Sequence, residues 1–109
     1  KRFFVNEFIR EQIFHKFNKE VPYSTEVVTE IFDRSNENII KIESTIIVER
    51  DTQKGILIGK NGLALKKVGV GARKKLEFFF KMKVNLKLFV KVNKKWRSNI
   101  KKLKDFGYN

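Results

Sequence analysis

Four consecutive residues, Gly59-Lys60-Asn61-Gly62, combine two glycines with a lysine and an amide directly after the apolar run Ile56-Leu57-Ile58. Glycines spaced this way let the backbone turn sharply and remove two β-carbons, so a phosphodiester chain can approach the main-chain N–H groups closely. Lys60 adds a mobile positive charge. A helical pattern begins at Leu63, and a helix N-terminus favours anions through its unpaired N–H groups and its dipole. Such residues suit a loop that holds a nucleic-acid backbone.

The glycines do not fit the two common nucleotide-binding fingerprints. A phosphate-binding loop of nucleoside triphosphatases needs four residues between its first glycine and the Gly-Lys pair, followed by Ser or Thr. Only three residues separate Gly55 from Gly59, and Asn61 follows the lysine. The dinucleotide fingerprint lacks its third glycine after Gly69-Val70-Gly71. A plain helix-to-helix turn with Gly59 as its C-cap is an equally open interpretation of the four residues alone.

The net charge of the chain points to a polyanionic partner. Lys and Arg number 25 against 12 Asp and Glu, which gives a net charge of +13. A small domain stays soluble with a net charge of about two to eight, so this excess indicates binding to nucleic acid or to an acidic membrane surface. The alternative to a nucleic-acid-binding domain is therefore a basic membrane-surface or protein-docking module that uses an amphipathic helix at residues 3–17.

The residues offer little for catalysis or metal binding. The chain has no cysteine, and His15 is its only histidine. No Ser-His-Asp set, carboxylate pair or metal-ligating cluster emerges from the sequence, so we expect no catalytic residue, no metal and no cofactor. The absence of cysteine fits a reducing compartment. We expect a cytoplasmic protein, with peripheral contact at the inner face of the cell membrane as a further option.

The length of 109 residues suits a single domain over residues 1–109. No proline- or glycine-rich linker divides the chain, and no apolar run is long enough for a signal sequence or a membrane span. The first residue is Lys1 rather than Met, and we expect the chain to be a piece of a longer protein.

Hydrophobic spacing predicts a helix and then two strands in the first half of the chain. Apolar residues recur at helical spacing over residues 3–17, and Pro22 follows soon after. Residues 27–33 are β-rich with apolar side chains on both faces, and residues 40–48 alternate apolar and polar side chains. The connection at residues 35–38 is too short for a crossover, so we expect an antiparallel hairpin.

A short helix that Asp51 or Thr52 can cap is predicted to lead into the glycine turn. A longer helix follows over residues 63–80, with an apolar stripe on one side and lysines over much of the rest. The stripe stays in phase across Gly69 and Gly71. We therefore expect another backbone to pack closely at one of these glycines, rather than a break in the helix.

The last elements complete an α+β fold. Residues 84–92 alternate as a third strand, and Trp96, Ile100 and Leu103 predict a final amphipathic helix stopped by Gly107. The predicted architecture is a three-stranded sheet packed by helices, in the order α-β-β-α-α-β-α.

The region around the glycine turn resembles a KH domain of the type II, bacterial arrangement. The motif is Ile56-Leu57-Ile58-Gly59-Lys60-Asn61-Gly62, with a predicted hairpin before it and a long helix and a strand after it. Within that class, the flanks are similar to the C-terminal domain of the Era family of ribosome-assembly GTPases. The matching pieces span nearly the whole chain and include Arg10-Glu11-Gln12-Ile13, Glu20-Val21-Pro22-Tyr23-Ser24, Val68-Gly69-Val70-Gly71-Ala72-Arg73-Lys74, Trp96-Arg97 and Leu103-Lys104-Asp105-Phe106-Gly107-Tyr108.

This resemblance implies a function. Era family members pair an N-terminal GTPase domain with this domain, which holds the 3′ end of 16S ribosomal RNA during maturation of the small ribosomal subunit. The implied partners are single-stranded RNA, the small ribosomal subunit and the GTPase domain of the same parent chain. The fragment itself carries no phosphate loop or guanine-reading motif, so it is not expected to be an enzyme. Phe89 stands where Trp is expected in many relatives, and the aromatic character is kept.

Carried onto this sequence, the resemblance implies that the glycine turn clamps the RNA backbone, through Gly59, Lys60, Asn61 and Gly62. We expect an apolar groove beside the turn to take the bases, floored by Ile56, Ile58 and Leu63. Further phosphate contacts are expected from the flanking basic residues Lys54, Lys66, Lys67 and Arg73. Each basic side chain is equally explained as a solvated helix face. For any one of the three apolar side chains, a place in the core is the more common use.

Overall fold

The computed structural model describes residues 1–17, 21 and 25–94. Its elements are α1 (Arg2–Lys16), β1 (Thr25–Asp33), β2 (Ile39–Val48), α3 (Asp51–Ile58), a 3-10 turn (Lys60–Gly62), α4 (Leu63–Phe80) and β3 (Lys83–Val92). The predicted α+β class and the order α-β-β-α-α-β are confirmed. The final helix predicted around Trp96, Ile100 and Leu103 lies outside the described residues.

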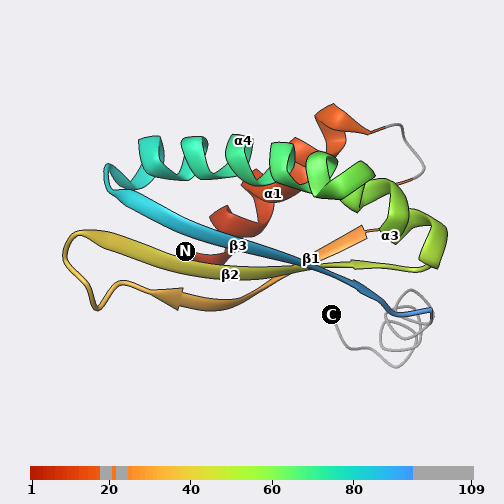
Figure 1. The fold of residues 1–109 in the computed structure, drawn as a ribbon. Coiled ribbons are helices and arrows are strands. Elements are labelled where there is room, and N and C mark those ends of the chain that lie inside the picture. Colours follow the sequence, from red (N-terminus) through yellow and green to blue (C-terminus); the bar gives the residue numbers. More distant parts are fainter. Residues whose placement is uncertain (18–20, 22–24, 95–109) are drawn as a thin grey trace, which may run out of the picture.

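The three strands form one mixed sheet in the order β1-β2-β3. β1 and β2 pair antiparallel, as their short connection predicts, whereas β3 runs parallel to β2. A parallel neighbour needs a crossover connection, and α3 and α4 supply it. Figure 1 shows α1 and α4 together over one face of the sheet, with α3 at the end opposite the β1–β2 turn. The glycine turn therefore lies at one end of a two-layer molecule.

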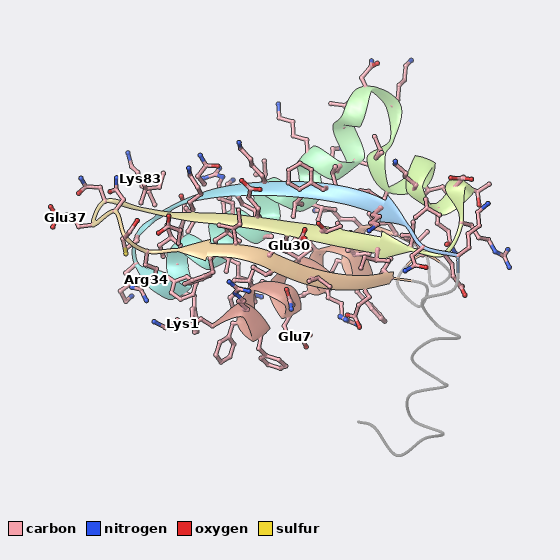
Figure 2. All side chains as sticks on the ribbon, turned by 90° about the horizontal axis from the view of Figure 1, so that it is seen from below. Lys1, Glu7, Glu30, Arg34, Glu37 and Lys83 are labelled. Carbon is pink, nitrogen blue, oxygen red and sulfur yellow. The ribbon has the colours of Figure 1, made fainter. Side chains whose placement is uncertain are left out.

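Figure 2 shows the other face of the sheet, which no helix of the described part of the chain covers. Glu30 lies on this side and accepts a hydrogen bond from the Thr45 hydroxyl on the neighbouring strand. Glu37 and Lys83 lie at the end of the sheet where β1 turns into β2. None of the helices formed by the described residues has the length and apolar character needed to cross a membrane.

A bulge in β1 explains why this strand carries apolar residues on both faces. Thr29 pairs with Ser44 and Ile31 with Glu43, so Glu30 is an extra residue on the β1 side of the ladder. The extra residue reverses the alternation of side chains along the rest of the strand. Val27, before the bulge, is buried, and Phe32, after it, packs against the core beneath the helices.

The core lies between the sheet and the two long helices. Its members recur at the period of the element that carries them: Val5, Ile9 and Ile13 on α1, Val68, Ala72 and Leu76 on α4, and Ile40, Ile42, Ile46 and Val48 on β2. One polar group joins the layers, because the buried Thr29 hydroxyl donates to Asn6 Oδ1 (2.5 Å) and lies 2.8 Å from the Ser44 hydroxyl. A buried hydroxyl that is fully hydrogen-bonded costs little and fixes how α1 sits on the sheet.

The start of α3 differs from the prediction that Asp51 or Thr52 would cap it. The N-cap residue is Arg50, and its side chain does not cap the helix. The buried Gln53 side chain accepts hydrogen bonds from the main-chain N–H groups of Glu49 (3.1 Å) and Arg50 (2.9 Å). An amide at the third helical position that reaches back in this way supplies one half of a capping box and satisfies the N–H groups just before the helix.

The helix α4 runs unbroken across Gly69 and Gly71, as predicted, but the predicted close backbone contact is wrong. A β-carbon on Gly71 would lie 2.0 Å from Oε1 of Gln12, so the close neighbour is a side chain of α1. At Gly69 a β-carbon would meet only Leu88 Cδ1, at an ordinary 3.6 Å. Gly71 therefore makes room for the Gln12 side chain of α1, and Gly69 leaves open space above Leu88 of β3.

Candidate nucleic-acid interface

The turn between α3 and α4 depends on backbone conformations that favour glycine. Gly59 has φ 73° and ψ −178°, a region open essentially to glycine alone, and a β-carbon there would lie 2.6 Å from Ala64 Cβ. Gly62 has φ 74° and ψ 10° in the left-handed region, with nothing within 4 Å of an added β-carbon. Conformation and packing therefore both require glycine at position 59. At Gly62 only the left-handed conformation favours glycine, because no neighbouring atom would meet a side chain there.

Some of the amide groups that were expected to hold phosphates are already used inside the turn. The N–H of Gly62 donates to the carbonyl oxygen of Gly59 (3.2 Å), and the N–H of Leu63 donates to that of Lys60. The amides of Lys60 and Asn61 donate to no other described residue. The main-chain contribution to an anion site here is thus confined to those two N–H groups.

The side chains of Lys60 and Asn61 are exposed at the tip of the turn. Neither forms a hydrogen bond or an ion pair with another residue that the structure describes. Asn61 itself is left-handed, with φ 55°, a conformation that Asn and Asp tolerate better than other side chains. The tip therefore presents a lysine, an amide and two free N–H groups to any ligand that reaches it.

An open groove of about 350 Å³ runs beside the turn, between α4 and β3. We call it the sheet-side groove, and its lining residues are Gly62, Leu65, Lys66, Gly69, Val70, Arg73, Leu86 and Leu88. The α4 members recur at intervals of three and four, which places them on one side of the helix. The leucines give the groove an apolar floor, and Lys66 and Arg73 give it a basic edge.

The apolar floor differs from the predicted one. Leu63 lies about 200° around the helix from Leu65, because consecutive helical positions turn by about 100°. Leu65 faces β3 and lines the sheet-side groove, whereas Leu63 is 53% exposed on another side of α4. Ile56 (52% exposed) and the half-buried Ile58 lie on α3 and are not among the groove's lining residues.

The structure separates the four flanking basic residues that were expected to contact phosphates. Lys66 and Arg73 line the sheet-side groove, and Lys67 lies on the neighbouring side of α4 with Leu63. Arg73 pairs with Glu77 (3.0 Å), which also accepts a hydrogen bond from the Val84 N–H, so part of its charge is already neutralised. Lys54, on α3, lines neither the sheet-side groove nor the hollows beside Lys67 and Leu63.

A second basic surface adjoins the turn, and the sequence interpretation missed part of it. We call it the lysine face, after its members Lys16, Lys60, Lys66, Lys67 and Lys74, which line two adjoining hollows between α1 and α4. Lys74 could have been found from helical spacing, because it lies seven positions after Lys67. Lys16 could not, since only the packing of α1 on α4 brings residues this far apart in the sequence together.

The residues that the structure describes contain no group of three or more His, Cys, Asp or Glu side chains placed to hold a metal ion. This end of the molecule presents an exposed cationic turn, an apolar groove beside it and a basic face on the other flank.

Comparison with known proteins gives this arrangement a family context. A family model described as KH domain matches residues 20–97. The chain is 48% identical over 108 residues to a GTPase Era of Geotalea uraniireducens (strain Rf4) and 47% identical to one of Geobacter sp. (strain M21). Each match covers 99% of this chain and 36% of the relative, so the chain spans about a third of the length of these relatives.

Solved structures of Era agree with the fold. A complex of Era with MgGDPNP and nucleotides 1506–1542 of 16S ribosomal RNA has a TM-score of 0.86 at 37% identity, covering 98% of this chain and 36% of that one. A variant Era of Aquifex aeolicus bound to GDP and aluminium fluoride has a TM-score of 0.85 at 37% identity, with the same coverage. These matches confirm the resemblance to a KH domain of the Era type that the sequence predicts.

Proposed function

This chain belongs to the KH domain family, and from that premise we propose that it binds single-stranded RNA through the turn at residues 59–62 and the sheet-side groove. The observation that carries the proposal is the position of the turn. Its Gly62 lines a groove with a leucine floor, and the same turn carries the exposed Lys60 and two free amides. Backbone phosphates and splayed bases need these two kinds of surface side by side.

The binding step follows from the chemistry of the two surfaces. Lys60 attracts a phosphate, and the N–H groups of Lys60 and Asn61 donate to its oxygens, which turns the bases toward α4. The bases then cover the apolar floor of Leu65, Leu86 and Leu88. Lys66 at the edge neutralises a second phosphate. This division assigns affinity mainly to the turn and base selection to the groove.

The RNA that we propose is the 3′ end of 16S ribosomal RNA, in small-subunit assembly. The support is the Era complex that contains nucleotides 1506–1542 of this RNA, to which the chain is similar over 98% of its length. We propose further that residues 1–109 are one RNA-binding domain at the C-terminal end of a longer GTPase, and that this protein works in the cytoplasm. The fragment supplies the RNA contact, and the GTPase domain of the same parent chain supplies nucleotide hydrolysis.

Salt dependence provides the first test of backbone binding. Three or four phosphate contacts on a single strand predict a slope of about −2 to −3 in a plot of log K against log salt, because each contact releases condensed counterions. Affinity for an unstructured RNA should then fall by roughly 15- to 60-fold between about 50 and 200 mM KCl. Fluorescence anisotropy with a labelled strand measures this slope.

Vesicle binding measured beside RNA binding separates the proposal from a membrane-surface module, which the family comparison does not favour. Peripheral membrane contact remains our secondary proposal, and its support is the exposed aromatic side chains Phe3 and Phe78, with Lys81 lying 5.3 Å from the Phe78 ring centroid. Binding to phosphatidylglycerol vesicles without any binding to RNA would reverse the order of the two proposals. A salt-independent RNA affinity would contradict backbone binding itself.

Filling the sheet-side groove provides a second test. Gly69→Leu places a branched side chain above Leu88, where the bases are expected to lie, and should weaken RNA binding about tenfold. The fold should persist, because leucine is about 1 kcal/mol better than glycine within a helix. Gly69→Ala is the control, since its β-carbon meets Leu88 at an ordinary 3.6 Å and leaves the groove open. Unchanged affinity in a folded Gly69→Leu variant would place the bases elsewhere.

A further inference from the structure

The lysine face lies on the side of α4 that meets the end of α1, and three of its members, Lys16, Lys67 and Lys74, have no role in the binding described above. We propose that it is a second RNA-contact surface, which holds the backbone of nucleotides that flank those in the sheet-side groove. The inference rests on the proposed function, because it extends the same strand beyond the turn. It adds Lys16 and Lys74 to the residues that contact RNA.

The charge of this face is uniform. Its two hollows, of about 530 and 510 Å³, are lined by the five lysines and by no carboxylate. None of the five lysines takes part in an ion pair with another described residue. Glu11, farther along α1, is already engaged by Lys75. Unpaired lysines around a concave surface give a positive potential that only an anionic partner neutralises.

The floor of the face is apolar and suits a sugar-phosphate chain. Leu63 is 53% exposed there, and Phe17 and Val70 lie in the same hollows. Lysines around exposed apolar side chains allow phosphates to be paired while ribose and base surfaces cover the carbon atoms between them. Packing within the domain does not account for a leucine as exposed as Leu63, and contact with RNA gives this side chain a function.

The face is continuous with both parts of the primary site. Lys60 belongs to the turn and also lines the first hollow, while Lys66 and Val70 line both the second hollow and the sheet-side groove. A KH loop clamps about four nucleotides. A longer strand must leave the groove, and a basic surface that begins at the same lysine is the adjacent place for its phosphates.

A comparison of RNA lengths tests the proposal. In Lys16→Glu/Lys74→Glu, affinity for a single strand of about five nucleotides should stay within twofold of the parent, because both lysines lie outside the turn and the groove. Affinity for a strand of about twelve nucleotides should fall at least about tenfold, with a salt slope smaller by about 1 to 1.5. The affinity of the neutral variant Lys16→Gln/Lys74→Gln for the longer strand should lie between those of the parent and the glutamate variant. A loss in this variant also shows that the effect is not a folding defect caused by the added glutamates.

Lys87→Glu/Lys91→Glu is the matched control, because it makes the same charge change at two exposed lysines of β3. It should leave the preference for the longer strand intact. Equal losses in the two glutamate variants, or no loss for the long strand in the Lys16/Lys74 variants, would overturn the second surface. A loss of binding to phosphatidylglycerol vesicles with unchanged RNA binding would assign the face to lipid instead. Failure of the parent to bind the short strand would refute the proposed function itself.

Discussion

Replacing Lys60 and Asn61 together with aspartate should weaken binding to single-stranded RNA by at least about 100-fold. The change puts two carboxylates where a phosphate is expected, beside the only two amides of the turn that remain free in the described structure. Repulsion then acts at the point where the strand is held, and Lys66 in the groove cannot compensate for it. Anisotropy titration of the parent and the variant with one labelled strand measures the loss.

The fold should tolerate this double change. Both side chains are exposed, aspartate accepts the left-handed conformation of Asn61 nearly as well as asparagine, and acidic groups favour a helix N-terminus such as that of α4. Asn85→Asp/Lys87→Asp makes the same chemical change on the exposed side of β3 and serves as the control. If the turn variant kept the parent affinity while its circular dichroism spectrum was unchanged, the turn would not be the clamp.

The parts of the fold that the sequence predicts are those in which one face is buried at the element's own period. Residues 40–48 alternate because β2 lies in the middle of the sheet, with one side against the helices. Val68, Ala72 and Leu76 recur every four residues because one side of α4 meets the core. Burial of this kind appears in the local pattern, whatever the partner is.

Features set by a distant partner leave no such pattern. The parallel pairing of β3 depends on the crossover through α4, and the bulge at Glu30 depends on how β1 meets β2. The lining of the sheet-side groove has the same origin. Leu63 and Leu65 are the same residue type two positions apart, and only the position of β3 decides which of them lines the groove. Lys16 joins the basic surface for the same reason, through the packing of α1.

Gly59→Ala is expected to lower the free energy of unfolding by about 2–4 kcal/mol, the largest stability effect of a single methyl group at this turn. Two costs combine. The φ of 73° with ψ of −178° is a conformation that alanine avoids, and its β-carbon would lie 2.6 Å from Ala64 Cβ and 3.0 Å from the Ala64 nitrogen. Because Ala64 lies in the first turn of α4, relief requires moving the start of that helix. Urea denaturation followed by circular dichroism measures the loss.

Gly62→Ala is the matched comparison, because its φ of 74° is also positive but nothing lies within 4 Å of the added β-carbon. Left-handed strain alone predicts a cost of about 1 kcal/mol there. The steric share at Gly59 can be isolated in an Ala64→Gly background, where the cost of Gly59→Ala should fall while its conformational part persists. Equal losses at the two glycines would mean that Ala64 moves aside freely. The turn would then be held by backbone conformation alone. Contact with Ala64 would not fix the exposed cationic tip against the start of α4, and phosphate binding depends on that fixed position.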